Sequence, residues 1–281
     1  MEYKHIIYQP GRIARIILNR PRYMNAQSRL MREEMDDAFV RATNDDEVCV
    51  IILSGAGESF SAGHDIGTTE DLADRKARGL PKDRLGRYRD MRADCLENTM
   101  RWRNVPKPTI AMVHGYCIFG GWMFATAMDL LFASEDAMFL PSHFQYFSTP
   151  WDIGPKKAKE ILFEHRFISA WEAYDLGFVN RVFPTKAKLE EETLTYAQRV
   201  AENYAREPFR VRTVKFSINH MLDTMGFTTA LEAAYHSYCV MMGLEERQLP
   251  AVSQGGLSMT PTALHNLELT KPWLEAARRH K

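Results

Sequence analysis

Two glycine-containing turns carry the residues with the clearest potential for chemistry. Residues 59–66 (SFSAGHDI) follow the apolar run 48–53, and residues 114–121 (HGYCIFGG) follow the apolar run 109–113. Glycines allow left-handed backbone angles and bring bare N–H groups close to a ligand. The amide of Gly120 also stands where a helix should begin, and unpaired donors there favour negative charge. If the two turns converge, their amides could stabilise a thioester enolate; otherwise they are simply tight strand-to-helix turns.

A histidine and an aspartate later in the chain could activate water. The imidazole of His143 can change its charge between about pH 5 and 8. Asp152, nine positions on (152 − 143), could fix the tautomer of that imidazole, as a carboxylate does in a nucleophilic triad. The alternative is that His143 is a packed histidine and that Asp152 caps the helix expected near Lys156. The sequence leaves both interpretations open.

Hydrophobic periodicity predicts the elements that must position these groups. Short apolar runs rich in β-branched residues indicate strands, and they occur at residues 13–19, 48–53, 109–113, 130–133 and 178–183. A helical face lies between the first two strands, with Ser28 as a plausible N-cap, and it consists of Met31, Met35, Ala38, Phe39 and Ala42. Alternating strands and helices predict an α/β fold.

Helices are expected in the rest of the chain. The charged stretch 72–103 is typical of a loop followed by a long helix, and shorter helices are predicted at 122–128, 156–163 and 170–176. Beyond about residue 186 the pattern is helical throughout, with segments near 187–205, 208–225, 227–246 and 264–280. We therefore predict an α/β core over residues 1–204 and a helical region over residues 205–281.

Four segments resemble the motifs of one family. Residues 61–66 (SAGHDI) are similar to a SAGADI turn, and residues 114–121 are similar to an NGYALGGG turn. Residues 18–26 match the pattern LNRPxxxNAL up to its last position, and residues 168–184 resemble ISAxEAxxxGLVxxVxP, with Phe178 in place of its leucine. In this order and over this length, the motifs resemble the enoyl-CoA hydratase/isomerase (crotonase) superfamily.

The resemblance implies a spiral of ββα units, a C-terminal helical region used to form trimers or dimers of trimers, and an acyl-CoA substrate. It implies no cofactor, since coenzyme A is part of the substrate, and no metal. The oxyanion amides would be those of His64 and Gly120, while Asp65 would brace the loop. Further substrate-binding positions carried over, or expected around the acyl group and nucleotide, are Arg22, Ala62, Phe119, Trp122, Met123, Phe144, Trp151 and Lys271.

The chain departs from a hydratase at both proton-transfer positions. The family's hydratases use two glutamates, and Met123 and His143 stand at those positions here. Methionine cannot transfer a proton. The spacing of His143 and Asp152 is similar to that of a pair in oxocamphor hydrolase, a superfamily member that cleaves a carbon–carbon bond in a free diketone. Hydration, isomerisation and carbon–carbon hydrolysis therefore stay open, as does a non-catalytic acyl-CoA-binding protein.

The composition excludes several other classes of function. Lys+Arg and Asp+Glu both number 36 in 281 residues, so no net charge would attract nucleic acid or an anionic membrane. The four cysteines are scattered, which fits a reducing cytoplasm better than a disulfide framework. No GxGxxG motif followed by an acidic residue indicates a nicotinamide or flavin site. The sequence also predicts no membrane-spanning segment.

Overall fold

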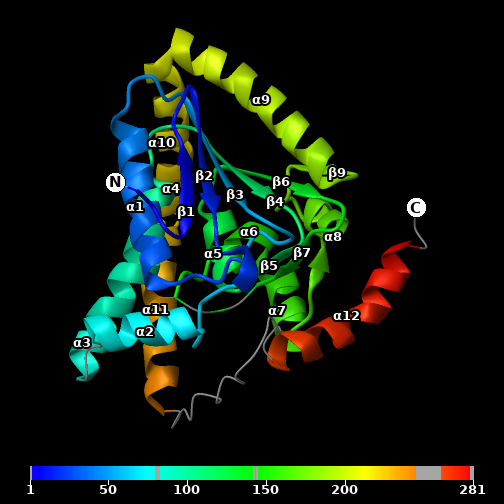
Figure 1. Ribbon diagram of the computed structural model, residues 1–281. Helices are drawn as coiled ribbons and strands as arrows, with labels where there is room; N and C mark the ends of the chain where they lie inside the picture. The colour runs from blue at the N-terminus through cyan, green and yellow to red at the C-terminus, as the bar shows by residue number, and fades with distance from the viewer. Residues whose placement is uncertain (1, 80–82, 142, 144, 245–260, 279–281) are drawn as a thin grey trace.

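The large sheet of the protein has six strands. A computed structural model describes residues 2–79, 83–141, 143, 145–244 and 261–278 (Figure 1). The strands are β1 (Ile6–Gln9), β2 (Ile13–Leu18), β3 (Val50–Gly55), β4 (Thr109–Val113), β6 (Leu130–Ser134) and β9 (Arg181–Phe183). They lie side by side in the order β1-β2-β3-β4-β6-β9, with β1 antiparallel to β2 and the other pairs parallel.

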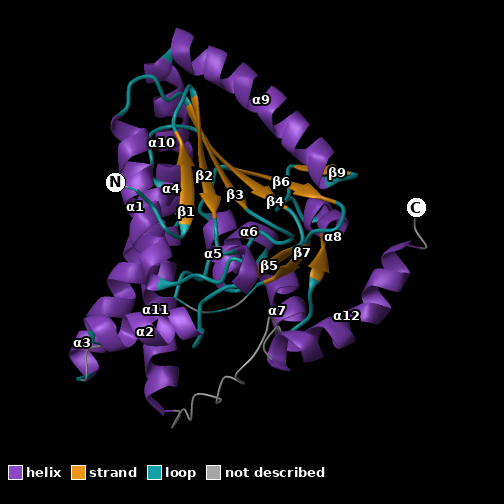
Figure 2. Cartoon of the chain, viewed as in Figure 1, coloured by secondary structure: helices purple, strands orange, loops and turns teal. Residues whose placement is uncertain are grey.

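A second, smaller sheet lies beside the first. It contains β5 (Tyr116–Ile118), β7 (Met138–Leu140) and β8 (Ile168–Ser169), in the order β5-β7-β8. Each of β4 and β6 in the large sheet is followed by a strand of the small sheet and then by helix, α5 (Gly120–Thr126) or α6 (Thr149–Ile153) with α7 (Pro155–Glu164). Figure 2 shows these strands enclosed by helices. The α/β fold and its ββα units are confirmed.

The helix α1 (Arg29–Asn44) forms as its periodicity predicts. The hydroxyl of Ser28 accepts a hydrogen bond from the amide of Met31 at 3.0 Å, so Ser28 is the N-cap. The predicted apolar face is buried. Alternate residues of β3 point to opposite faces of the sheet, and both faces are covered: Ile51 packs in the cluster that contains α1, and Ile52 packs against α9 (Lys186–Arg206).

The charged stretch is more helical than the sequence predicts. Its first part forms α2 (Thr69–Arg78), where a loop is expected. The second part is one continuous helical run, formed by α3 (Arg84–Met91), the π-helix η2 (Arg92–Glu97) and α4 (Asn98–Arg103). The side chains of Asn98 and Thr99, at the start of α4, donate hydrogen bonds to the carbonyls of Asp94 and Cys95 in η2, at 2.5 and 2.7 Å. These bonds satisfy carbonyls that a regular α-helical ladder would use.

The sequence predicts four of the remaining helices: α8 (Ala170–Asp175), α10 (Pro208–Thr224), α11 (Phe227–Leu244) and α12 (Pro261–Arg278). It does not predict the short helix η1 (Pro21–Tyr23). Figure 1 shows α10 and α11 on the side of α1 and α4, whereas α12 lies beyond the small sheet. The hydroxyl of Thr270 in α12 accepts a hydrogen bond from the amide of Phe167 at 2.7 Å. This bond attaches the last helix next to β8.

Two strand predictions need correction. The strand expected at 178–183 begins at Arg181, because the amides of Phe178 and Val179 both donate to the carbonyl of Ala173 and close the turn after α8. The strands β1, β5, β7 and β8 are not predicted from the sequence. They have two to four residues each, which is too short for a recognisable period.

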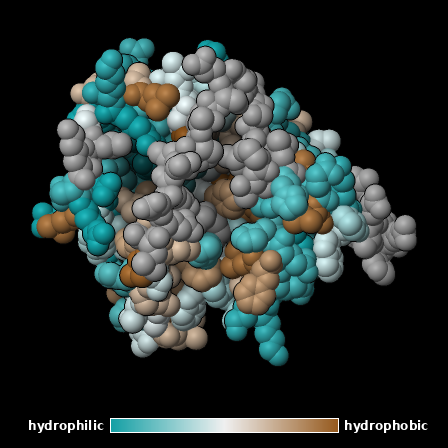
Figure 3. Space-filling view, turned by 90° about the horizontal axis from the view of Figure 1, so that it is seen from below, coloured by the Kyte–Doolittle hydropathy of each residue, from teal (hydrophilic) through white to brown (hydrophobic). Residues whose placement is uncertain are grey.

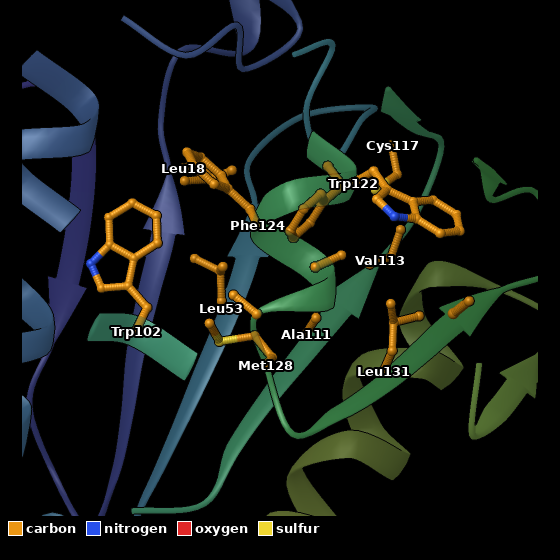
Figure 4. Packing of buried hydrophobic residues seen from close by; sticks show 14 of the residues in the cluster. Leu18, Leu53, Trp102, Ala111, Val113, Cys117, Trp122, Phe124, Met128 and Leu131 are labelled. Atoms are coloured by element: carbon orange, nitrogen blue, oxygen red, sulfur yellow. The ribbon is translucent and has the colours of Figure 1, made fainter. Parts of the chain in front are cut away.

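The main core lies between the large sheet and helices α1, α4 and α5. Figure 4 shows Trp102, Phe124 and Trp122 converging there with aliphatic residues of β2, β3 and β4. Phe124 is 1% exposed and meets the ring of Trp102 edge-on at 5.4 Å. The face of the molecule seen in Figure 3 mixes hydrophilic residues with separate hydrophobic ones. In the described part of the chain, no helix combines the length and hydropathy that crossing a membrane requires.

Substituting Phe124→Ala should destabilise the protein by about 3–5 kcal/mol, because it leaves a cavity beside Trp102. Urea unfolding followed by circular dichroism measures the change. The matched control is Phe163→Ala on α7, where the ring is 80% exposed; its effect should stay within about 0.5 kcal/mol. Equal losses in both variants would contradict this description of the core.

Candidate active site

The two glycine turns lie against each other at the ends of β3 and β4. The amide of Phe60 donates to the carbonyl of His114, and the amide of Ser61 donates to the carbonyl of Tyr116, both at 2.9 Å. In return, the amide of Ile118 donates to the carbonyl of Ser61 at 2.9 Å. The first turn therefore pairs with β5 like a short extra strand.

The pairing brings Gly63 and Gly120 into close contact. Gly63 has a φ of +90°, and a Cβ added to it would lie 2.8 Å from the carbonyl oxygen of Ile118 and 3.3 Å from the nitrogen of Gly120. Only glycine fits this approach. Among the described residues, neither the amide of His64 nor that of Gly120 donates a hydrogen bond to another group. The two amides proposed for the oxyanion hole thus belong to touching turns and have no partner within the described chain.

A buried ion pair braces the first turn. The guanidinium group of Arg20 lies 2.8 Å from Asp65, and both side chains are almost fully buried. The same carboxylate accepts hydrogen bonds from the hydroxyl and the amide of Thr68 at 2.6 and 2.9 Å. Burial alone would raise the pKa of Asp65, but the bonds from Thr68 and Arg20 lower it below its ordinary value. Asp65 therefore holds the loop as a charged carboxylate.

The side chain of His64 is half-buried and contacts the π-helix η2. Its Nε2 lies 3.6 Å from the sulfur of Cys95 in η2. Burial, with a smaller contribution from the charge of Arg32, lowers the pKa of His64 to about 3. The imidazole is therefore neutral at ordinary pH. Its Nδ1 lies 2.6 Å from where a Cβ on Gly120 would stand.

Met123, which replaces a hydratase glutamate, lies in an apolar cluster. It is 2% exposed and packs with Cys95, Tyr146 and Phe227. Trp151 is half-buried against this cluster, with its ring 5.5 Å from that of Phe227. Charged groups border this cluster: the guanidinium group of Arg103 lies 4.5 Å from the ring centre of Phe227, and that of Arg92 lies 5.8 Å from the ring centre of Tyr235.

The other residues predicted around the acyl group are dispersed. Trp122 packs in the main core, stacked on Phe178 with ring centroids 4.0 Å apart. Phe119 has a φ of +46°, is half-buried and packs beside the small sheet. Ala62 donates its amide to the carbonyl of Met24 at 2.8 Å. Phe144 lies outside the described residues.

Asp152 lies within α6 and does not cap the following helix. The N-cap of α7 is Gly154, so the prediction that Asp152 caps this helix is wrong. The carboxylate of Asp152 accepts hydrogen bonds from the hydroxyls of Ser148 and Thr126, at 2.7 and 2.8 Å. Burial raises the pKa of Asp152 to about 7 despite these bonds. A carboxyl group with such a pKa can exchange a proton near neutral pH.

His143 is exposed. Its ring meets that of Phe147 edge-on, with the ring centroids 6.4 Å apart. Partial desolvation and the charge of His165 lower its pKa below 6.5. The hydrogen bonds described above for Asp152 go to Ser148 and Thr126, so the pairing of His143 with Asp152 stays a prediction.

Arg22 and Lys271, the two basic residues expected beside the nucleotide part of coenzyme A, are exposed. The guanidinium group of Arg22 lies 5.5 Å from the ring centre of Tyr23, and Lys271 pairs with Glu268 at 2.6 Å. Within the described residues, no group of three or more histidine, cysteine or acidic side chains could hold a metal ion.

Sequence reasoning missed Gln27. Its side-chain amide lies beside Gly120 and is 1% exposed. The one available signal is its position: residue 27 follows Asn25-Ala26 where the family pattern LNRPxxxNAL has leucine.

Comparisons with known proteins agree with this fold. The family model described as enoyl-CoA hydratase/isomerase matches residues 9–239. EchA13 of Mycobacterium tuberculosis is 38% identical over 259 residues, covering 83% of this chain and 79% of its own length.

Two solved structures are also similar. A probable enoyl-CoA hydratase from Mycobacterium thermoresistibile has a TM-score of 0.76 at 38% identity, covering 85% of this chain and 95% of that one. An enoyl-CoA hydratase/isomerase from Xanthobacter autotrophicus Py2 has a TM-score of 0.76 at 31% identity, covering 96% and 94%.

The fold and the paired glycine turns define an acyl-CoA enzyme of the crotonase class. The chain belongs to the enoyl-CoA hydratase/isomerase family. The predicted superfamily is thereby confirmed.

The unusual pKa of Asp152 predicts a pH-dependent stability. Because its folded-state pKa is raised, the wild-type protein loses stability as the pH rises from about 3.8 through about 7. The variant Asp152→Asn removes this effect, so its stability relative to wild type should grow between pH 4 and 8, by at most about 4 kcal/mol. Urea unfolding across that range measures it, with the exposed Asp175→Asn as control. A difference that does not vary with pH would contradict the raised pKa.

Proposed function

We propose that this enzyme stabilises the enolate of an acyl-CoA thioester between the amides of His64 and Gly120. The observation that carries the proposal is the contact of the two glycine turns: a Cβ added to Gly63, next to His64, would lie 3.3 Å from the nitrogen of Gly120. A carbonyl oxygen that accepts hydrogen bonds from both N–H groups could carry the negative charge of the enolate without being protonated by a side chain. Each donor of this kind is worth about 2.7–4 kcal/mol of barrier.

Proton transfer would fall to His143, with Asp152 supporting it. Met123 carries no transferable proton, so the two-glutamate route is unavailable. In hydration, His143 would take a proton from water as the oxygen bonds to C3, and the imidazolium would return that proton to C2 of the enolate. In carbon–carbon hydrolysis, the same water would lose its proton to His143 and add to a β-ketone. The C–C bond would then break to give a carboxylic acid and an enolate, and the imidazolium would protonate that enolate at carbon. The lowered pKa of His143 keeps its imidazole available as a base at neutral pH.

The region 205–281 would form the interface of a homotrimer or of a dimer of trimers. Large apolar side chains on α10 support this: Phe209 is 83% exposed and Phe216 is 67% exposed. Such surfaces are typical of contacts between subunits. Arg22 would lie beside the nucleotide of coenzyme A, and Lys271 would contact a ligand of the neighbouring subunit.

A non-catalytic acyl-CoA-binding protein is the second candidate. Met123 favours it, because a thioether cannot transfer a proton and this side chain packs with Cys95, Tyr146 and Phe227. The first candidate differs in requiring turnover of bound thioester.

A panel of enoyl- and β-ketoacyl-CoA esters separates the two candidates. We expect a product from at least one ester by mass spectrometry. In Gly120→Ala, the new methyl group would lie 2.6 Å from Nδ1 of His64. To relieve this clash, the backbone amide of residue 120 would have to move. Its turnover should therefore fall about 100- to 1,000-fold, while the unfolding curve stays close to that of wild type. Binding of esters without any product would favour the binding protein.

The variant His143→Ala should lower kcat about 100- to 10,000-fold on the ester that is turned over. Because a base must be neutral to accept a proton, wild-type kcat/KM should rise with pH through a pKa below 6.5. The matched control is His220→Ala, on the exposed side of α10, which should leave both the rate and the pH profile unchanged. Full turnover by His143→Ala would rule out the histidine as the base.

A further inference from the structure

The side-chain amide of Gln27 is buried without a hydrogen-bonding partner. The residue is 1% exposed, and among the described residues neither its Nε2 nor its Oε1 finds a partner. Leaving such a group unpaired in the interior is unfavourable. A buried amide with both ends free, a donor and an acceptor, is expected only where another molecule completes it.

This amide lies at the proposed oxyanion site. Both of its polar atoms are 2.8 Å from where a Cβ on Gly120 would stand, and the Nδ1 of His64 is 2.6 Å from the same point. Gln27 therefore shares with His64 the space next to the backbone that would hold the thioester oxygen.

The backbone around Gln27 is held rigidly. The backbone amide of Gln27 donates to the carbonyl of Gly63 at 2.7 Å. The backbone carbonyl of Gln27 accepts from the amide of Asp65 at 3.0 Å and from the guanidinium group of Arg32 at 3.3 Å. These bonds fix residue 27 to the same turn that carries the amide of His64. The position of the side chain is thus set by the oxyanion turn itself.

We infer that Gln27 recognises a hydroxyl group on C2 or C3 of the acyl chain, next to the thioester. A hydroxyl group both donates and accepts, so it can satisfy both ends of the amide. The thioester oxygen would satisfy the donor alone. This inference rests on the proposed function, because the thioester must first be anchored at Gly120.

The consequence is substrate selection. A site built around a buried hydrogen-bonding group discriminates against an analogue that leaves this group unpaired. Gln27 would therefore favour hydroxylated acyl groups over plain ones of equal length.

Calorimetric titration with butanoyl-CoA, 2-hydroxybutanoyl-CoA and 3-hydroxybutanoyl-CoA tests this. The wild-type enzyme should bind one of the hydroxylated esters at least about tenfold more tightly than butanoyl-CoA. Gln27→Leu should lose that preference while binding butanoyl-CoA at least as tightly as wild type, because leucine leaves no amide unpaired. Gln27→Met, with an unbranched side chain of similar length, should behave in the same way. The exposed Gln198→Leu on α9 should keep the wild-type pattern.

The outcomes that overturn the inference are distinct. Equal binding of all three esters by wild type removes it and leaves the proposed function intact, and this measurement needs no variant. A preference that survives in Gln27→Leu or Gln27→Met assigns the hydroxyl to another residue. If none of the three esters binds, the proposed function fails and the inference fails with it.

Discussion

The hydrogen bonds that join the two glycine turns are the constraint on which the rest of the site depends. They pair Ser61 with Tyr116 and Ile118, and so tie the end of β3 to the small sheet. Gly63 can approach Gly120 only because Gly63 carries no side chain. The ion pair of Arg20 with Asp65 stabilises the same turn. The backbone of Gln27 is hydrogen-bonded to this turn on both sides of His64.

The sequence predicts what is local and misses what depends on distant contacts. The strand β4 and the helix α1 could be predicted because their apolar residues repeat at a regular spacing along the chain. The small sheet could not, since its strands gain stability from partners far away in sequence. The burial of His64 depends on Cys95, 31 residues later, and no local pattern encodes it. Asp152 was expected as a cap or a catalytic partner, and its hydroxyl partner Thr126 is 26 residues away.

The proposed oxyanion site would combine backbone donors with uncharged side chains. Burial lowers the pKa of His64 to about 3, so its imidazole is neutral, and Gln27 cannot ionise. In such surroundings the electrostatic stabilisation of an enolate would come mainly from fixed amide dipoles. Charged groups such as Asp65 act one layer further out, where they shape the turn.

The π-helix η2 changes which face of its helical run points inward. Each residue of an α-helix advances the direction of the side chains by about 100°, so one wider turn rephases everything after it. Before and within η2, Tyr88 and Cys95 pack towards α11, in the cluster that contains Met123. After it, Trp102 points into the main core below the large sheet. A single helical run thereby contacts two hydrophobic clusters, because Trp102 packs in the main core while Met91 and Met100 pack against the cluster that contains Met123.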